Sequence, residues 1–565
     1  MERNVKELYQ VWLDKVEDES LLAELKSISG NEEKINDAFY RDLAFGTGGL
    51  RGTIGAGTNR MNIYTVAKAS QGLANYVNKT AKSEQKSIAI GYDSRIKSDL
   101  FSQVAAAVYA ANGIQVHLYP ELMPTPAVSF AIRELQTDAG VMVTASHNPA
   151  QYNGYKVYGA DGCQIKTDVA AAISEEINKL DTFNDIVEYD FDSALAAGKI
   201  KYIEPEVYTA YIEAVKNESE IDENTKINKD VKIIYSPIHG AGLKPVLRAL
   251  EEMGYTNLSV VKEQELPDGN FPTAPYPNPE YPEAMALGIE YAKREDADMF
   301  MATDPDADRL GIAIKNPSGE FELVSGNLVG VLLLDYIIHR KQTTNTMPEH
   351  PVFVKTIVTT SLAEKVADSN NVETVNVLTG FKYIGEQIAK LEAVGRVDDY
   401  ILGFEESYGY LSGPYVRDKD AVNAAILVAE MFSYYMTNGV NLFDKLEEIY
   451  DKYGFYLDTL ESYQFEGQAG FERMNAIMQG LRDQEISEIA GMKVTEIFDY
   501  NKGVDDLPKS DVLKFILGEN GSFVVRPSGT EPKLKIYISL KADREEAESL
   551  EKELRSEIEK IAGIK

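Results

Sequence analysis

Three aspartates stand at alternate positions in the segment DPDADR, at Asp304, Asp306 and Asp308. Carboxylate oxygens are the ligands that Mg²⁺ prefers, whereas zinc favours nitrogen and sulfur ligands. The three carboxylates can converge on one such cation if the segment is extended. Arg309, which follows directly, could pair with them or hold a phosphate group beside the metal. A solvated acidic turn is the alternative, and an EF-hand is not expected, because its Gly and distal Glu are missing.

The segment TASHNP places Ser146 and His147 shortly after the apolar run VMV. A lone serine in such a position often caps a helix, and the GxSxG pattern of serine hydrolases is missing. If Ser146 lies near a magnesium site, its hydroxyl could exchange a phosphoryl group whose charge the metal neutralises. His147 could then contact the substrate, or it could simply fill a polar pocket.

Two further loops combine residue types that suit a phosphosugar. The segment GFEESYG carries Glu405 and Glu406, whose carboxylates could accept hydrogen bonds from sugar hydroxyls. The segment RPSGTEPK joins a guanidinium, hydroxyls and a glycine, which together can wrap a phosphate group. Its residues of interest are Arg526, Ser528, Gly529 and Thr530. An exposed acidic turn and a plain hairpin loop are the respective alternatives.

One pattern of elements recurs along the chain: a short apolar run ends in a Gly-rich or polar loop, and a helical pattern follows. Examples are SIAIGYDSR (87–95), AGVMVTASHNP (139–149), ADMFMATDPDADR (297–309) and YILGFEES (400–407). Apolar strands that alternate with helices predict α/β layers with parallel sheets, in which ligands bind beyond the carboxyl ends of the strands. We therefore expect three similar α/β units that hold the polar loops at the edges of their sheets.

The two ends of the chain follow other patterns. Residues 521–540 read as strand, loop and strand, and an amphipathic helix follows, with Asp543 and Glu546 suited to a capping box at its start. This order predicts a small α+β domain. Residues 1–16 predict a charged amphipathic helix that lacks the apolar core of a signal peptide.

The composition narrows the classes of function. A net charge of −33 argues against a large nucleic-acid surface, because phosphate backbones are bound by dense Lys and Arg. The sequence contains no apolar run of about 18 residues that could span a membrane. The single cysteine, Cys163, excludes an internal disulfide. We therefore expect a cytoplasmic enzyme with no nucleic-acid or membrane partner.

Taken together, the four loops TASHNP, DPDADR, GFEES and RPSGTEPK, in this order, resemble the signature loops of the α-D-phosphohexomutase superfamily. The segment FGTGGLRG (45–52) resembles the opening motif of that superfamily, and the match runs from about residue 40 to the C-terminus. The length and the loop variants are most similar to the bacterial α-phosphoglucomutases related to phosphopentomutases.

The resemblance implies an α/β fold with four domains around a central cleft. The first three domains would be similar and have mixed sheets, which replaces the expectation of purely parallel sheets, and the C-terminal domain would be a smaller α+β unit. The expected boundaries place the phosphoserine loop in 1–205, the metal loop in 206–325, the sugar loop in 326–460 and the phosphate loop in 461–565.

The resemblance also implies a role for each loop residue. Ser146 would carry a phosphoryl group and, with the three aspartates, hold Mg²⁺. Lys156 would be a general acid and base, and its pKa should be lowered by neighbouring cations if it is to act as a base near neutral pH. The other implied residues are Arg51, His147 and Arg309 near the reacting group, Glu405, Ser407 and Lys419 at the sugar, and Arg526, Ser528, Gly529 and Thr530 at the non-reacting phosphate.

The activity implied is the interconversion of glucose 1-phosphate and glucose 6-phosphate through a glucose 1,6-bisphosphate that turns round in the cleft. Departures from the pattern are Gly48, where many relatives have serine, and Phe404, an inserted aromatic that leaves the sugar preference open. Phe381 stands where mannose-tolerant relatives often have histidine, which favours glucose.

Other functions remain open at this point. Phosphopentomutase and phosphomannomutase are alternatives of the same family. A metal-dependent sugar phosphatase and a non-catalytic phosphosugar sensor are more distant ones. The expected partners are small phosphosugars, and the expected assembly is a monomer or a weak homodimer.

Overall fold

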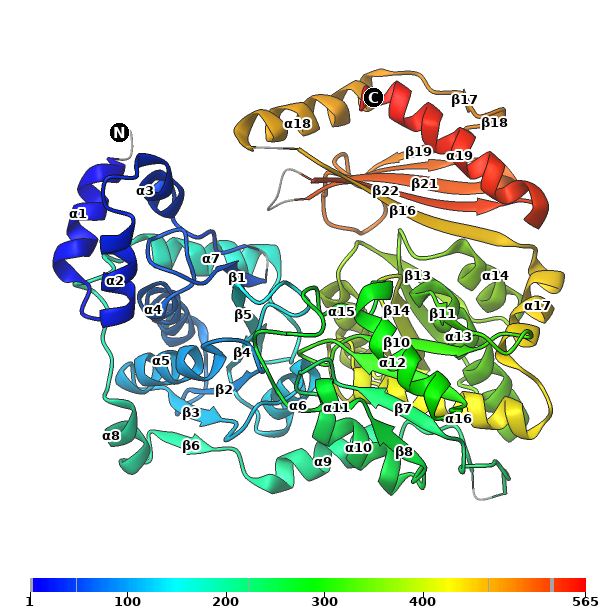
Figure 1. Ribbon diagram of the computed structural model, residues 1–565, viewed down its shortest axis with the longest axis horizontal. Coiled ribbons are helices and arrows are strands. Elements are labelled where there is room, and N and C mark those ends of the chain that lie inside the picture. The colour runs from blue at the N-terminus through cyan, green and yellow to red at the C-terminus, as the bar shows by residue number, and fades with distance from the viewer. Residues whose placement is uncertain (1–3, 47, 223, 466, 529–532, 565) are drawn as a thin grey trace. The chain divides into compact units, whose positions relative to one another are not determined.

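The computed structural model describes residues 4–46, 48–222, 224–465, 467–528 and 533–564, and the chain forms two compact units (Figure 1). The first unit comprises the chain up to Val324 together with Gly385–Val397 and Gly409–Ser433. The second comprises Ser325–Ile384, Asp398–Tyr408 and the chain from Tyr434 onward. Helices α15 (Phe381–Ala393) and α16 (Ala421–Thr437) contribute residues to both units.

The predicted N-terminal helix is confirmed as α1 (Val5–Lys15). It packs with α2 (Glu19–Ser27) and α3 (Glu32–Phe39) around a cluster centred on Trp12, which is only 1% exposed. The Trp12 ring meets the Phe39 ring edge to face at 5.6 Å. The N-terminal segment is thus a small helical layer whose apolar cluster also includes Ala56, Tyr64 and Phe183.

The first sheet of the first unit carries the Ser146 loop. Its strand order is β1-β5-β4-β2-β3-β6, and β4 at its centre is buried along its whole length. Strands β2, β3, β4 and β6 run parallel, whereas β5 pairs antiparallel with both β4 and β1. The strands are β1 (Gly49–Thr53), β2 (Ser87–Tyr92), β3 (Gln115–Leu118), β4 (Ala139–Val143), β5 (Tyr152–Gly159) and β6 (Ile200–Tyr202).

Helices cover both faces of this sheet. On one face, residues of α4, α5 and α7 share an apolar core with β2, β4 and β5. On the other face, Gly91 and Gly140 leave the space that Val128 and Ile132 of α6 occupy. The helices are α4 (Ile63–Thr80), α5 (Ser98–Ala111), α6 (Thr125–Glu134), α7 (Thr167–Asn178) and α8 (Phe191–Ala196).

The second sheet carries the aspartate loop and has the order β11-β10-β9-β7-β8. Strand β9 runs parallel to β7 but antiparallel to β10, which in turn pairs antiparallel with β11. The strands are β7 (Ile233–Ser236), β8 (Leu258–Val260), β9 (Met299–Thr303), β10 (Leu310–Lys315) and β11 (Phe321–Val324). The helices of this region are α9 (Pro205–Lys216), α10 (Leu243–Glu252), α11 (Lys262–Glu265) and α12 (Pro282–Arg294).

The expectation of purely parallel sheets is therefore wrong, and the mixed sheets implied by the resemblance are confirmed. Residues 144–151 join β4 to β5, and residues 304–309 join β9 to β10. A parallel crossover needs about a dozen or more connecting residues, so such short connections must return antiparallel. It follows that these two loops are followed by strands and not, as expected, by helices.

The second unit contains a sheet in which β12 pairs in parallel with both β13 and β14. Apolar contacts across it include the rings of Phe353 and Phe404, whose centroids are 5.4 Å apart. The strands are β12 (Val352–Thr356), β13 (Glu373–Val377) and β14 (Tyr400–Glu405), and the helices are α13 (Gly326–Thr344), α14 (Ser361–Ser369) and α17 (Leu442–Tyr453). The short strand β15 (Gly409–Leu411) belongs to the first unit.

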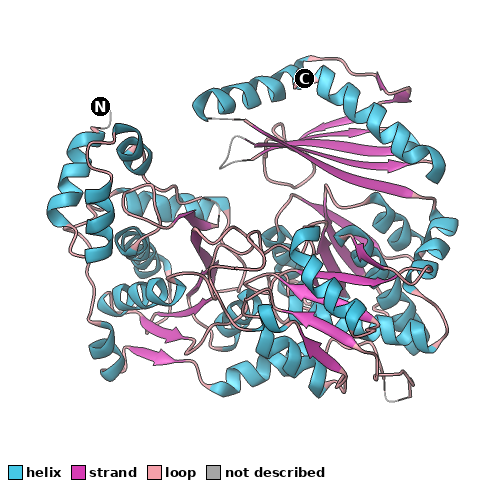
Figure 2. Ribbon diagram, in the orientation of Figure 1, coloured by secondary structure: helices cyan, strands magenta, loops and turns pink. Residues whose placement is uncertain are grey.

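The C-terminal part of the second unit is the predicted small α+β region, drawn by secondary structure in Figure 2. Its antiparallel sheet has the order β16-β22-β21-β20-β19, and the predicted strand–loop–strand is the hairpin of β21 and β22. The strands are β16 (Tyr456–Gln464), β19 (Glu496–Asp499), β20 (Leu513–Ile516), β21 (Gly521–Pro527) and β22 (Lys533–Lys541). Helix α18 (Gly467–Asp483) and the hairpin of β17 (Glu488–Ile489) and β18 (Met492–Lys493) complete it.

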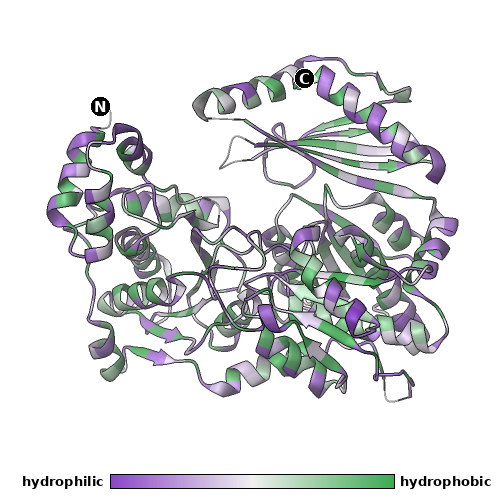
Figure 3. Cartoon of the chain, viewed as in Figure 1, coloured by the Kyte–Doolittle hydropathy of each residue, from purple (hydrophilic) through white to green (hydrophobic). Residues whose placement is uncertain are grey.

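The predicted C-terminal helix is confirmed as α19 (Arg544–Ile561), and its alternation of hydrophilic and hydrophobic residues is visible in Figure 3. Ala547, Leu554 and Ile558 are buried against the antiparallel sheet. The predicted capping box is wrong, because the Asp543 side chain makes no hydrogen bond to the first turn. A membrane-spanning helix, one that is both long and apolar enough, does not occur among the described residues.

Candidate active site

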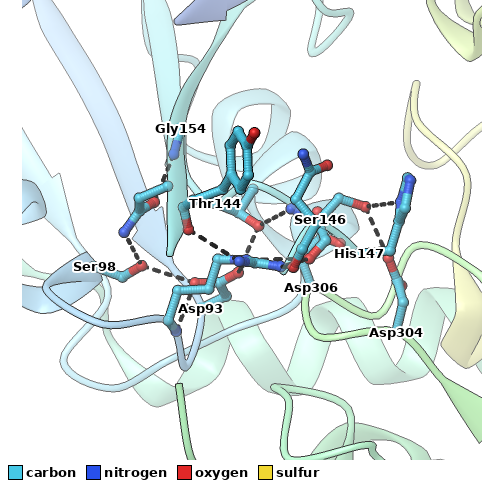
Figure 4. Close-up of polar contacts among 12 residues, drawn as sticks. Asp93, Ser98, Thr144, Ser146, His147, Gly154, Asp304 and Asp306 are labelled. Atoms are coloured by element: carbon cyan, nitrogen blue, oxygen red, sulfur yellow. Dashed lines mark hydrogen bonds and ion pairs between the residues drawn. The ribbon is translucent and has the colours of Figure 1, made fainter. Parts of the chain in front are cut away.

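The loop after β4 brings Ser146 to the aspartate loop of the second sheet (Figure 4). The Ser146 hydroxyl donates a hydrogen bond to Oδ2 of Asp304 at 2.8 Å and lies 3.2 Å from Nδ1 of His147. The residue is 3% exposed and has a φ of 51°, in the left-handed region that non-glycine residues seldom adopt. The serine oxygen is thus held in a buried, polar position.

The three aspartates converge as predicted, with one oxygen of each lying within 4.8 Å of the others. They do so through a turn and not an extended segment, because the Ala307 amide bonds to the Asp304 carbonyl and Ala307 has a φ of 48°. All three side chains are buried. Burial and the neighbouring carboxylates hold the pKa of Asp304 well above its usual range.

The donor set of this cluster fits a hard divalent cation. Oδ1 of Asp306 and Oδ1 of Asp308 are buried and accept no hydrogen bond from any residue that the structure describes. Buried acceptors without partners are costly, and oxygen-only ligands suit Mg²⁺. The cluster could therefore hold Mg²⁺ through Asp304, Asp306 and Asp308, with the Ser146 oxygen adjacent.

Two lysines face the carboxylates. Lys156 Nζ, on β5, lies 2.7 Å from Oδ2 of Asp306 and 3.2 Å from Oδ2 of Asp308. Lys419 Nζ lies 2.8 Å from the same Asp308 oxygen. Burial alone would lower the pKa of Lys156, but Asp306 and Asp308 outweigh it and raise that pKa above its usual value. The expected lowering by neighbouring cations is therefore wrong, because the nearest charges are carboxylates.

The predicted arginines and histidine of the first unit lie around the serine loop. Arg309 forms an ion pair with Glu280, and its Nε is 3.9 Å from Oδ1 of Asp308. Arg51, on β1, donates to the side-chain oxygen of Asn148 at 3.1 Å. Burial, followed by the charges of Arg309 and Arg51, holds the pKa of His147 well below its usual value of 6.5. A neutral imidazole therefore lies beside Ser146.

The predicted sugar loop belongs to the second unit. Glu405 ends β14, is buried, and accepts a hydrogen bond from the Gly380 amide at 2.9 Å. Ser407 follows in the turn and is half-buried. Phe404 is fully buried, and its ring fills the space left by Gly330 of α13. Phe404 is therefore a core residue of this unit.

The described part of the predicted phosphate loop flanks the connection between β21 and β22 in the second unit. Arg526 is on β21, and the Ser528 amide donates to the Lys533 carbonyl at 2.7 Å. Gly529 and Thr530 lie outside the described residues. In the first unit, the structure brings together the remaining predicted residues: Arg51, Ser146, His147, Lys156, Asp304, Asp306, Asp308, Arg309 and Lys419.

Comparison with known proteins places this geometry in a family. Family models match four consecutive segments of the chain, described as phosphoglucomutase/phosphomannomutase alpha/beta/alpha domains I, II and III and as the C-terminal domain. The matched residues are 42–184, 209–319, 325–453 and 476–557. The chain belongs to the phosphoglucomutase/phosphomannomutase family. The predicted resemblance to the phosphohexomutases is thereby confirmed.

Relatives of this family member are similar over nearly their whole length. The chain is 40% identical to a phosphoglucomutase of Staphylococcus saprophyticus over 94% of this chain and 96% of the relative. It is 38% identical to a phosphoglucomutase of Staphylococcus aureus, over 94% and 95% of the two chains.

Solved structures share its fold. A putative phosphomannomutase from Thermus thermophilus has a TM-score of 0.69 at 21% identity and covers 93% of this chain and 99% of its own. The open form of a Paramecium phosphoglucomutase, pp63/parafusin, has a TM-score of 0.67 at 20% identity, over 93% and 95% of the two chains.

In this family member, sequence reasoning missed several residues that hold the loops. Asp93 and Arg95 lie at the end of β2 and contact the serine loop. Thr125, at the start of α6, donates through its hydroxyl to Oδ2 of Asp306 at 2.6 Å and through its amide to the Asp306 carbonyl at 2.9 Å. The polar end of SIAIGYDSR was a visible signal for the first two, whereas Thr125 stands in no recognisable motif.

Proposed function

We propose that the chain interconverts glucose 1-phosphate and glucose 6-phosphate, with Ser146 as the carrier of the phosphoryl group. The observation that carries the proposal is the 2.8 Å hydrogen bond between the Ser146 hydroxyl and Asp304 within a buried aspartate cluster. The phosphoglucomutase names of the Staphylococcus relatives, at 40% and 38% identity, support glucose as the sugar.

The reaction is a balanced exchange between two hydroxyls. In the first half, the P–Oγ bond of phosphoserine 146 breaks and a P–O bond to the free sugar hydroxyl forms, which gives glucose 1,6-bisphosphate. The proton that the sugar hydroxyl loses ends on Ser146 Oγ. After the bisphosphate has reoriented, the other phosphoryl group returns to Ser146, and the proton returns to the sugar oxygen.

The residues of the first unit suit these steps. Mg²⁺ held by Asp304, Asp306 and Asp308 would supply positive charge beside the moving phosphoryl group. Arg309 and Arg51 add fixed positive charge near Ser146. Lys156 holds its proton, since its pKa is raised, and can donate to a sugar oxygen from its place beside Asp306. His147 stays neutral and offers one ring nitrogen to the serine oxygen.

We infer from the family which residues bind the parts of the substrate that do not react. Glu405, Ser407 and Lys419 would bind sugar hydroxyls, which resemble each other in the two orientations of the substrate. Arg526, Ser528, Gly529 and Thr530 would bind the phosphate that does not react. The division 1–205, 206–325, 326–460 and 461–565 into four domains is part of this proposal, and the four matched segments support it.

The test is an assay of glucose 6-phosphate formation from glucose 1-phosphate with Mg²⁺ and catalytic glucose 1,6-bisphosphate, beside mannose 1-phosphate and ribose 1-phosphate. We expect turnover without net phosphate release, loss to background in Ser146→Ala, and retention in Ser102→Ala, a matched change at a buried serine on α5. Turnover on another sugar alone would replace the substrate. Activity in Ser146→Ala would refute the phosphoserine mechanism, and net phosphate release would indicate a phosphatase.

A further inference from the structure

The backbone at Ser146 has an unfavourable conformation that contacts with other residues must stabilise. Its φ of 51° lies in the left-handed region, which costs a non-glycine residue energy relative to the right-handed or extended alternatives. This conformation aims Oγ at Asp304, so any relaxation of the loop would move the reacting oxygen away from the aspartate cluster.

The peptide group on the N-terminal side of Ser146 is fixed by Thr144 and Asp93. The Ser146 amide donates to the Thr144 hydroxyl oxygen at 2.8 Å, and that hydroxyl donates to Oδ2 of Asp93 at 2.5 Å. The other oxygen of Asp93 accepts from the Arg95 amide at 3.0 Å and from the Ser98 hydroxyl at 2.8 Å. Figure 4 shows this chain of contacts ending at Ser146.

The peptide group on the C-terminal side is fixed by the Arg95 side chain, which is fully buried. Its Nε donates to the Ser146 carbonyl at 3.1 Å, and a second guanidinium nitrogen donates to the carbonyls of Ser146 and Asn148. The remaining nitrogen donates to the carbonyls of Pro149 and Tyr152, each at 3.0 Å. One guanidinium therefore ties together the whole connection between β4 and β5.

Phe271, in the loop between α11 and α12, lies against the same guanidinium. The Arg95 guanidinium carbon lies 5.0 Å from the centre of the Phe271 ring, in a cation–π arrangement. Nearby, Gly269 approaches so closely that a Cβ there would lie 2.4 Å from the Ile96 amide nitrogen. The Phe271 ring thus lies against the guanidinium, and the loop at Gly269 packs against the backbone at Arg95 and Ile96.

We propose that Arg95 is a positioning residue for phosphoryl transfer: it holds both the carbonyl of Ser146 and the turn that follows, so that Oγ stays directed at the aspartate cluster. The proposal rests on the proposed function. Arg95 touches no reacting atom, yet its hydrogen bonds set where the reacting oxygen lies. Lysine keeps the charge but has no planar fork, so it cannot hold four carbonyls at once.

The test compares Arg95→Lys with wild type at saturating substrate and by single-turnover transfer of phosphoryl from glucose 1,6-bisphosphate to Ser146. All rates are corrected for the folded fraction. We expect kcat and the transfer rate to fall by about tenfold or more, with KM within about threefold. Thr144→Val, which frees the peptide group on the other side, should give the same pattern. In amide exchange, residues 144–152 of Arg95→Lys should lose protection selectively.

Arg340→Lys is the matched control. Arg340 is also buried, at 5% exposure, and its guanidinium also lies 5.0 Å from an aromatic ring, that of Tyr434, but it belongs to the second unit. We expect Arg340→Lys to change stability without changing kcat per folded molecule.

The outcomes separate the inference from the function on which it rests. If wild type transfers phosphoryl to Ser146 but Arg95→Lys and Thr144→Val keep kcat within about twofold, the positioning role is refuted and the mutase function stands. If Arg340→Lys loses as much kcat per folded molecule as Arg95→Lys does, the loss reflects destabilisation in general, and Arg95 has only a structural role. If wild type shows no transfer to Ser146, the proposed function fails first.

Discussion

Two residues of this site show opposite pKa shifts, because carboxylates raise the pKa of Lys156, whereas burial is the largest cause that lowers the pKa of His147. Lys156 keeps its proton because two carboxylates face it. His147 loses its proton because it is buried and meets the charges of Arg309 and Arg51. Both residues were implied as active-site groups, yet their protonation depends on partners that are remote in sequence.

The shift of His147 predicts a pH dependence of stability. Its folded pKa lies below the unfolded value of 6.5, so the unfolded state binds the proton more readily. The contribution is fully present above pH 6.5 and is lost as pH falls below it, by up to about 1.4 kcal/mol per pH unit. We expect His147→Gln to flatten this loss in urea unfolding between pH 7.5 and 5.5, measured with a chelator present.

The same change at His350, which is exposed, serves as the control for that experiment. Equal slopes for wild type and His147→Gln would mean that the His147 imidazole is accessible to protons in the folded enzyme. That result would contradict its neutral state beside Ser146.

At the scale of elements, the capping box occurs at a different helix from the one where the sequence predicted it. The box expected at α19 is absent, but Asn62 and Thr65 form one at the start of α4. The Asn62 side chain also donates to the carbonyls of Gly55 and Gly57, each at 2.9 Å. Asn62 therefore fixes both the helix start and the turn that follows the Arg51 strand.

This difference predicts that replacing the N-cap residue by alanine lowers the free energy of unfolding by different amounts at the two helices. Asn62→Ala should destabilise the protein by about 2 kcal/mol, because it removes a cap and leaves two buried carbonyls without their donor. Asp543→Ala should cost about 0.5 kcal/mol or less, because no cap hydrogen bond is lost. Denaturant unfolding of both variants checks this. An Asp543 cost equal to that of Asn62 would show that the α19 cap forms in solution.

At the scale of the whole molecule, the negative net charge contrasts with the few cations that can bind an anionic substrate. The net charge of −33 repels anions in general, so a phosphosugar must be met by local cations such as Lys156, Arg309 and Lys419. The aspartate cluster concentrates further negative charge at one buried point of the first unit. A divalent cation would relieve repulsion there.

This arrangement predicts where Mg²⁺ stabilises the molecule. At a Mg²⁺ concentration 100 times Kd, binding to the folded state contributes about 2.7 kcal/mol. Amide exchange should slow in residues 299–310 and 139–149, and not in the hairpin 521–541. Asp304→Asn should abolish the effect. Protection of the hairpin to the same degree, or protection that survives in Asp304→Asn, would place the cation elsewhere.

The sequence by itself determined which groups this protein has for its chemistry and the order in which they occur. The four loops identified the family, and the alternating strand and helix patterns predicted α/β units with a different C-terminal region. Local features sufficed for these predictions because side-chain chemistry and short-range periodicity depend only on residues that are close together in the sequence. The N-terminal and C-terminal helices were predictable for the same reason.

Only the tertiary structure decided how these groups are held and charged. Two short loops forced antiparallel strands into both sheets of the first unit. Phe404 proved to be core, because Gly330, remote in sequence, leaves the space for its ring. The raised pKa of Lys156 and the grip of Arg95 on the Ser146 loop depend on contacts between segments far apart in the chain. Burial and long-range Coulomb interactions exist only once the chain has folded, so the spacing of residues cannot reveal them.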